Sequence, residues 1–268
     1  MIDTPPVVLT VAGSDPSGGA GLQADLKTIH AHGAYGAAVP TLITVQDTRA
    51  VQEVELLSAD LVQAQLDSVL GDLSPAAAKT GALGTPGVAR LLGSVMERVP
   101  FGWVVDPVWL PSEGQPLSRG DVVDAYKDAI LPHAVLVTPN AQEASLLAEL
   151  PVRSLEDAAR AAERIAGLGA SAVLIKGGHL EGAARGTDLF WHGGAVVELA
   201  PTELLAGDYH GTGCTLSAAI ASRLALGADL SGAVRGAKAW LDIALARAFA
   251  VGKGAWPVNH LCPVGDKA

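Results

Sequence analysis

Cysteine is scarce in this sequence: the 268 residues contain only Cys214 and Cys262. Two thiols make no disulfide framework, so we expect a reducing compartment. No positively charged and then apolar stretch follows Met1, and we therefore expect no secretory leader and a cytoplasmic location. Long apolar runs are also missing, since none reaches the roughly 18 residues that a membrane-spanning helix needs. The sequence thus predicts no membrane partner.

Positive charge is in short supply as well. With 18 Lys and Arg against 28 Asp and Glu, the formal net charge is −10, which argues against the basic stripe that non-specific nucleic-acid binding requires. An anionic ligand would have to be held by local dipoles and a few lysines. Aromatic residues make up only 4% of the chain, whereas 49% of it is hydrophobic. Ala, Val, Leu and Gly must therefore form the core, which suits a buried parallel sheet with tightly packed helices.

Short apolar runs alternate with amphipathic segments along the whole chain. The predicted strands are 7–12, 37–46, 51–57, 76–83, 103–108, 134–139 and 172–178, with a hairpin at 187–199 that turns at 192–194. The predicted helices are 22–33, 60–71, 85–97, 117–130, 140–149, 154–168, 213–226 and 229–250. Such alternation with short connections predicts an α/β fold whose mostly parallel sheet is covered on both faces. No repeat, linker or low-complexity tract divides the chain, so we expect one domain over residues 1–268.

In a parallel sheet of this kind the ligand lies beyond the carboxyl ends of the strands, and this rule selects five loops. They follow Ala12, Gln46, Val105, Val137 and Ile175, and they contain the sequences GSDPSGGAG, QDT, DPV, TPNAQE and KGGH. Any one of them could be an ordinary turn. Five polar or glycine-rich loops at the same edge predict a binding site.

The first of these loops is rich in glycine, which permits positive φ angles and a close approach of the backbone to a ligand. It matches neither a P-loop nor the pattern GxGxxG. Asp25 lies in the first turns of the helix that follows. It either stabilises the N-terminus of that helix or accepts hydrogen bonds from a ligand amine.

Acidic and amide side chains open two of the other loops. Asp106 directly follows the apolar run WVV, and Asn140 and Glu143 open a predicted helix. One interpretation of the latter pair is helix capping, with Thr138 or Asn140 as the cap and Glu143 as its partner. The other joins them with Asp106 as oxygen ligands of Mg²⁺, mostly through water. Lys176 ends the apolar run SAVLI and offers a phosphate contact in an acidic protein.

The stretch HGTGCTLSAA, residues 210–219, places a thiol behind a Gly-x-Gly turn at the start of an Ala-rich helix. The first N–H groups of such a helix have no intrahelical partner, and together with the helix dipole they form an anion site. One interpretation is therefore a γ-phosphate cradle at Gly211, Thr212, Gly213 and Cys214. The Cys214 side chain, its pKa lowered by the dipole, would then accept a proton from an attacking hydroxyl. The alternative is a small buried cysteine after an ordinary turn.

Several segments together resemble the hydroxymethylpyrimidine kinase/phosphomethylpyrimidine kinase family of thiamine biosynthesis. In chain order they are GSDPSGGAGLQADLKT, VQDT, KTGALG, VVDPV, TPNAQEA, KGGH and HGTGCTLSAAIA, between about Val7 and His260. A bacterial pyridoxal kinase subgroup with the GTGC form is closely similar. Both are ribokinase-like, so the resemblance implies a single-domain three-layer sandwich with a central mostly parallel sheet and a small β flap. It also implies a homodimer.

The resemblance implies ATP-dependent phosphorylation of 4-amino-5-hydroxymethyl-2-methylpyrimidine and of its monophosphate, with ATP and Mg²⁺ as cofactors. Family roles then fall on matching positions of this chain. Pyrimidine binding falls on Gly13, Asp25, Gln46 and Val108, and the Mg²⁺–phosphate group on Asp106, Asn140 and Glu143. Nucleotide contacts fall on Lys176, Lys238 and Thr212, and the anion hole on Gly211, Thr212, Gly213 and Cys214, with Cys214 as the base where the wider superfamily has an aspartate.

The chain departs from the family pattern most clearly at Trp109–Gly114, which replaces a stretch that contains a lysine. Asp47, Tyr209 and the segment 252–260 also differ. If the lost lysine holds an anionic substrate, the second phosphorylation is the step affected. Two other functions stay open: a pyridoxal kinase on the same scaffold, and a non-catalytic pyrimidine-binding protein that keeps the fold.

Overall fold

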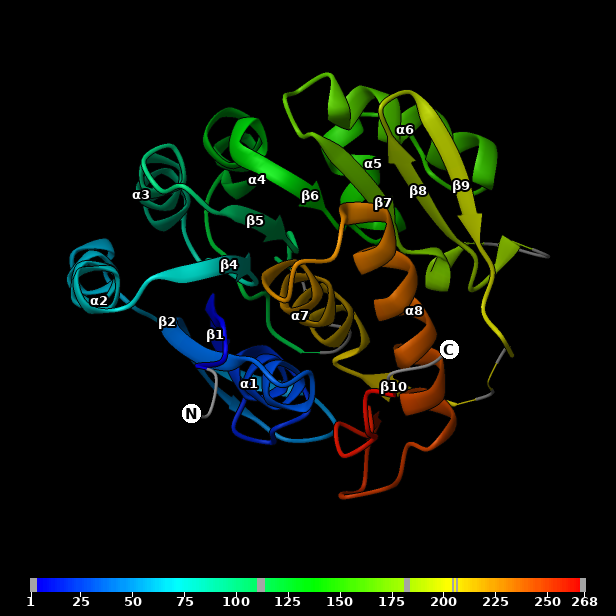
Figure 1. Ribbon diagram of the computed structural model, residues 1–268, viewed down its shortest axis with the longest axis horizontal. Helices are drawn as coiled ribbons and strands as arrows, with labels where there is room; N and C mark the ends of the chain where they lie inside the picture. Colours follow the sequence, from blue (N-terminus) through cyan, green and yellow to red (C-terminus); the bar gives the residue numbers. More distant parts are fainter. Residues whose placement is uncertain (1–3, 110–113, 181–183, 204, 206, 266–268) are drawn as a thin grey trace.

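The computed structural model describes residues 4–109, 114–180, 184–203, 205 and 207–265. Its main sheet has nine strands in the order β3-β2-β1-β4-β5-β6-β7-β8-β9 (Figure 1). Six of them run parallel: β1 (Val7–Ser14), β2 (Tyr35–Gln46), β4 (Pro75–Thr80), β5 (Gly102–Val105), β6 (Ala134–Val137) and β7 (Ala172–Ile175). Antiparallel pairing adds β3 (Val51–Leu56) at one edge and β8 (Asp188–His192) and β9 (Ala195–Leu199) at the other.

Helices cover both faces of the sheet. One face carries α1 (Gly21–Ala31), α7 (Thr212–Ala225) and α8 (Leu230–Ala246); the other carries α2 (Ala59–Asp72), α3 (Pro86–Met96), α4 (Val122–Ala125), α5 (Ala141–Ala148) and α6 (Leu155–Ala166) (Figure 1). Successive residues of a strand point to opposite faces, so Val8 of β1 packs with the first group and Leu9 with the second. The structure confirms the predicted α/β class, with a mostly parallel sheet between two helical layers.

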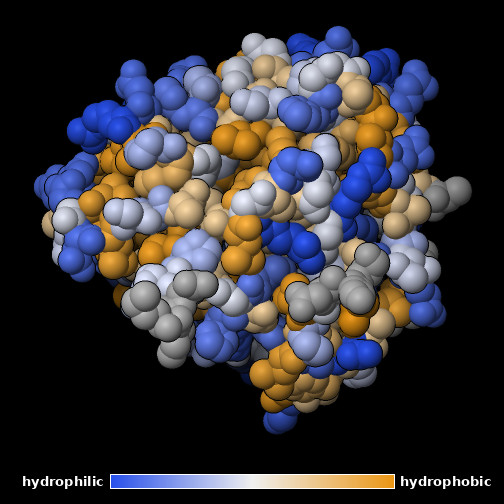
Figure 2. All heavy atoms as spheres, viewed as in Figure 1, coloured by the Kyte–Doolittle hydropathy of each residue, from blue (hydrophilic) through white to orange (hydrophobic). Residues whose placement is uncertain are grey.

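Charged side chains lie mainly on the outside of these layers. Hydrophilic residues crowd the upper and lateral edges of the face seen in Figure 2, and hydrophobic residues gather in patches nearer its centre. No helix among the described residues is both long and apolar enough to cross a bilayer.

The predicted hairpin turn is confirmed between β8 and β9. Gly193 and Gly194 have φ angles of 58° and 82°, and a two-residue loop with two positive φ values is the type I′ turn that matches the twist of paired strands. Glycine adopts these values without the steric cost of a Cβ.

The predicted helix at 117–130 is wrong in its first part. The residues before Asp121 bond to distant parts of the chain, since the Leu117 N–H donates to Trp109 O and the Arg119 N–H to Gly84 O. The helix begins at Val122 and changes after Ala125 into a π-helical turn, Tyr126–Ile130. Tertiary hydrogen bonds therefore override the local apolar pattern.

Two further differences concern the end of the chain. The predicted last helix, 229–250, ends as α8 at Ala246. A small second sheet pairs β10 (Tyr209–His210) with β11 (Trp256–Pro257) in parallel. This pairing ties the segment after α8 to the strand that leads directly into α7.

Two buried histidines make the fold sensitive to acid. The His32 ring meets Trp240 edge-on, with ring centroids 4.7 Å apart, and burial lowers the pKa of His32 to about 4. His260 Nε2 lies 3.0 Å from Thr215 Oγ1, and burial lowers the pKa of His260 to about 4 as well. Both rings are therefore neutral in the folded protein at neutral pH.

Lowering the pH from 6.5 toward 4 should reduce the free energy of unfolding, because the unfolded chain takes up protons that the folded chain excludes. Each buried histidine contributes roughly 1.4 kcal/mol per pH unit within this window. A His32→Phe variant should therefore show a pH slope smaller by about that amount, whereas His192→Phe, at an exposed site, should keep the wild-type slope. Urea unfolding at pH 7, 6 and 5 measures the slopes; equal slopes for wild type and His32→Phe would contradict the argument.

Candidate active site

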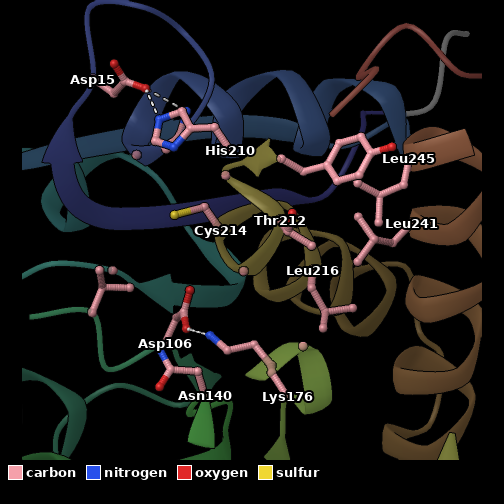
Figure 3. Close-up of a pocket in the computed structure, with 18 of the residues that line it drawn as sticks. Asp15, Asp106, Asn140, Lys176, His210, Thr212, Cys214, Leu216, Leu241 and Leu245 are labelled. Carbon is pink, nitrogen blue, oxygen red and sulfur yellow. Dashed lines mark hydrogen bonds and ion pairs between the residues drawn. The ribbon is translucent and has the colours of Figure 1, made fainter. Parts of the chain in front are cut away.

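A cavity of about 630 Å³ opens at the carboxyl ends of the parallel strands. All five loops selected from the sequence contribute to its wall, and so does the start of α7 (Figure 3). The predicted site residues in the wall are Gly13, Gln46, Asp106, Val108, Asn140, Glu143, Lys176, Gly211, Thr212, Gly213, Cys214 and Lys238. The geometry thus brings together residues that are up to 225 positions apart in the chain, from 13 to 238.

Asp106 and Lys176 form a buried ion pair in the floor of the cavity. Lys176 Nζ lies 2.6 Å from Asp106 Oδ1 and 3.8 Å from Glu143 Oε2 (Figure 3). Ser217 Oγ of α7 donates to Asp106 Oδ2 at 3.3 Å. Burial opposes the charge on Lys176, but Asp106 and Glu143 outweigh it and hold the Lys176 pKa above its ordinary value. Burial raises the pKa of Glu143 to about 7.

Asn140 and Glu143 form the predicted capping box of α5. The Glu143 N–H donates to Asn140 Oδ1 at 2.9 Å, and the Asn140 N–H donates to Glu143 Oε2 at 2.7 Å. The capping interpretation is therefore confirmed, and it positions both side chains beside Asp106.

The same residues offer hard oxygen donors to a cation. In the described part of the chain no group of three or more His, Cys, Asp or Glu side chains forms a metal cage. Mg²⁺ rarely needs one, because it keeps several waters and takes one or two carboxylates together with substrate phosphates. The carboxylates of Asp106 and Glu143 fit that mode of binding.

Gly211 shapes the start of α7. It is the N-cap residue with φ at 76°, and a Cβ there would collide with the Gly19 carbonyl oxygen. The cap contributes no side-chain hydrogen bond. Thr212, Gly213 and Cys214 of the first turn line the cavity, and the N–H groups at a helix N-terminus, which lack intrahelical partners, suit an anion.

Cys214 is half-buried, and its sulfur points into the space between the Asp15 loop and Asp106 (Figure 3). The backbone N–H of Gly21 favours the thiolate form of this side chain. Burial nevertheless raises the pKa of the Cys214 thiol to about 11, against the lowering effect of Lys79. The prediction of a lowered pKa is therefore wrong, because desolvation of the thiolate outweighs the favourable charges around it.

Asp25 is the predicted site residue that the structure does not place in the cavity wall. Its side chain is fully buried, and both carboxylate oxygens accept hydrogen bonds from Lys79 Nζ at 2.8 Å. Thr10 Oγ1 donates to Asp25 Oδ2 at 2.6 Å. The carboxylate is thus enclosed by protein groups, and in this structure it has no direct access to a ligand amine.

A network that the sequence did not single out joins the first loop to the start of α7. His210 Nε2 lies 3.0 Å from Asp15 Oδ2 and 3.1 Å from Gln46 Nε2 (Figure 3). Burial opposes the charge on Asp15, but bonds from His210, Ser17 and Ala20 hold the Asp15 pKa below its ordinary value. Asp15 lies in the segment GSDPSGGAG and His210 in HGTGCTLSAA. The sequence therefore assigns both residues to the same predicted edge of the sheet, although it does not predict their contact.

Lys238 of α8 also lines the cavity. Its Nζ is 3.1 Å from Asp242 Oδ1 and 3.6 Å from Asp188 Oδ2. The wall beside it is apolar, with Leu216, Leu241 and Leu245 close together in Figure 3.

Trp109, the first residue of the altered segment after Val108, does not line the cavity. Trp109 is buried and meets Tyr126 edge-on, with centroids 5.6 Å apart. The Trp109 side chain therefore belongs to the core. Residues 110–113, where the family's lysine is lost, lie outside the described residues.

Comparison with protein families shows to which class of enzyme the chain with this cavity belongs. The model of a family described as phosphomethylpyrimidine kinase matches residues 15–259. The chain belongs to this kinase family. It is accordingly a phosphotransferase with a ribokinase-like fold, and the resemblance seen in the sequence is confirmed.

Individual relatives and solved structures support this family assignment. A hydroxymethylpyrimidine/phosphomethylpyrimidine kinase from Rhizobium meliloti (strain 1021) is 46% identical over 95% of this chain and 96% of its own. The phosphomethylpyrimidine kinase from Clostridium difficile 630 has a TM-score of 0.77 and 36% identity, covering 88% of this chain and 97% of that one. The pyridoxal kinase from Staphylococcus aureus in complex with AMP-PCP and pyridoxal has a TM-score of 0.87 and 35% identity, covering 96% and 94%.

Proposed function

We propose that this phosphomethylpyrimidine kinase family member uses ATP to phosphorylate 4-amino-5-hydroxymethyl-2-methylpyrimidine, and then its monophosphate, in thiamine diphosphate biosynthesis. The observation that carries the proposal is the shared cavity. Gly13, Gln46 and Val108 line it together with the cradle at 211–214 and Lys238. An amide side chain and backbone groups suit the donors and acceptors of an aminopyrimidine, and Val108 suits its apolar edge.

The proposed roles in the transfer step follow from charge. Phosphoryl transfer needs mainly positioning and stabilisation of negative charge. The N–H groups at 211–214 hold the migrating phosphoryl group, and Lys176 supplies a positive charge beside it. The alcohol O–H bond breaks as its oxygen bonds to the γ-phosphorus, the bond from that phosphorus to ADP breaks, and the Cys214 thiolate takes the proton.

The proposal includes Mg²⁺, for which Asp106 and Glu143 are the carboxylates and Asn140 the residue that positions Glu143. The ion would neutralise charge on the ATP oxygens. ATP itself is placed by Lys176, Lys238 and the N–H of Thr212, with the apolar wall of α8 facing the base. The matched structural neighbour from Staphylococcus aureus was solved with an ATP analogue.

Three broader expectations belong to the same proposal. The 268 residues work as one kinase domain, the enzyme is a homodimer, and it acts in the cytoplasm, where its two free cysteines stay reduced. Sedimentation of the purified protein measures the oligomeric state directly.

A panel of three acceptors tests the function: the aminopyrimidine alcohol, its monophosphate, which accepts through a phosphate oxygen, and the alcohol pyridoxal. We expect kcat/KM for the aminopyrimidine to exceed that for pyridoxal by at least about tenfold, since a site built to pair with polar groups discriminates against ligands that leave them unpaired. ADP release gives the rates, and ³¹P NMR identifies the products. A preference for pyridoxal would replace the proposal with a pyridoxal kinase. Absence of ADP with all three acceptors would leave a non-catalytic binding protein.

A further inference from the structure

A fully buried ion pair lies under the active site and has no role in the mechanism so far. Lys79 of β4 and Asp25 of α1 both have side chains with 0% exposure, and Lys79 Nζ is 2.8 Å from each carboxylate oxygen. Thr10 of β1, which pairs with Lys79 in the strand register, donates the third hydrogen bond to the carboxylate. Such a pair rarely adds stability over apolar side chains of the same size. Stability alone is therefore a weak reason for its presence.

The position of the pair relative to the cavity gives it another use. Gly81 lines the cavity, and a Cβ on Gly81 would lie only 3.1 Å from Lys79 Nζ. The buried ammonium group therefore lies next to Gly81, on the side where a Cβ would project, and Gly81 itself lines the cavity. Asp25 belongs to α1, which packs against α7, the helix that carries Cys214.

Charges interact strongly in such a buried setting, because the local dielectric is low. Lys79 favours the thiolate of Cys214, whereas Asp25 and Asp106 oppose it. Burial opposes the charge on Lys79, but Asp25, Cys214 and Asp106 outweigh it and hold the Lys79 pKa above its ordinary value. The lysine thus stays charged, and its positive charge favours negative charge on the Cys214 sulfur.

We propose that Lys79 is a positioning residue for the transfer step: its ammonium, fixed next to Gly81 by Asp25, stabilises the thiolate of Cys214 that accepts the alcohol proton. This inference rests on the proposed role of Cys214. Asp25 keeps the lysine charged and in place, and Thr10 orients the carboxylate. Asp25, which the family pattern assigns to pyrimidine binding, would thereby act through Lys79 in this chain.

Alkylation of Cys214 by iodoacetamide tests the proposal without nucleotide or acceptor, because the thiolate is the reacting form. A Cys262→Ser background leaves Cys214 as the sole thiol. Lys79→Met should slow alkylation about tenfold or more at each pH between 7 and 10, the effect of one unit of thiol pKa. The double variant Lys79→Met, Asp25→Asn removes the opposing charge of Asp25 as well, so it should slow alkylation less than the single variant does. It leaves no unpaired buried carboxylate and serves if the single variant fails to fold.

Lys127→Met is the matched control, since it makes the same chemical change at an ion pair with Glu149. It should leave the alkylation rate unchanged. An alkylation rate within twofold of wild type in a folded Lys79→Met variant, or no slowing at all in a folded double variant, would overturn the proposal. If alkylation slows as expected but no acceptor in the panel is phosphorylated, the proposed function fails and the role of Lys79 in thiol ionisation stands.

Discussion

Replacing Cys214 by serine should lower the single-turnover rate of phosphoryl transfer by about 10²–10⁴-fold, the usual cost of losing a general base. The KM for ATP should change little, because the cradle consists of backbone N–H groups that the substitution keeps. A serine hydroxyl ionises far less readily than a thiol, so it takes the alcohol proton poorly. Rapid-quench measurement of labelled product separates this step from product release.

If the Cys214 thiolate is the base, the rate of phosphoryl transfer should also rise with pH. Burial raises the pKa of the Cys214 thiol to about 11, so the fraction of thiolate grows about tenfold per pH unit between pH 7 and pH 9. The wild-type transfer rate should rise along that slope, and Cys214→Ser should lose the rise. Cys214→Asp, a carboxylate already ionised in this range, should recover activity at pH 7 and flatten the profile.

Cys262→Ser is the matched control, because Cys262 is buried beside Trp240 and is not part of the cavity wall. It should keep the wild-type rate and slope. A Cys214→Ser enzyme within threefold of wild type would show that the thiol is not the base, while the backbone cradle would remain as proposed.

The positions of the site loops could be predicted from sequence because apolar runs such as VVLTVA and AVLIK mark strands buried on both faces. Parallel strands end at a common edge, so Gly13, Asp106 and Lys176 had to approach one another once the strands were recognised. The capping box at Asn140 and Glu143 was equally accessible, since it depends on residues three positions apart.

Features that depend on distant partners could not be predicted in this way. Asp25 is a helix residue in any local analysis, and only the fold brings Lys79, 54 positions later, onto its carboxylate. The sign of the Cys214 pKa shift likewise depends on how deeply the sulfur is buried, which no local pattern reports. The two-residue strands β10 and β11 are too short to have a periodicity, although their pairing places His210 beside Asp15.

Gly211→Ala should abolish most of the activity, and a matched control is available just beyond the other end of the same helix. Gly211 has a φ angle of 76°, and a Cβ at this position would collide with the Gly19 carbonyl oxygen. The substitution must therefore displace either the first loop or the first turn of α7. Since misplacing one donor to a developing anion typically costs about 10²–10³-fold, we expect kcat to fall by at least that factor.

Gly227→Ala separates this displacement from simple backbone strain. Gly227 follows α7 with a φ angle of 91°, and no described atom lies within 4 Å of a Cβ built there. Alanine at either position must adopt a left-handed backbone conformation, which costs roughly 1–2 kcal/mol. Thermal unfolding should therefore show a loss of stability in each variant. Only Gly211→Ala should lose activity at a temperature where both are folded. If Gly211→Ala keeps more than a tenth of the wild-type kcat, the N–H groups at the start of α7 do not hold the phosphoryl group in flight.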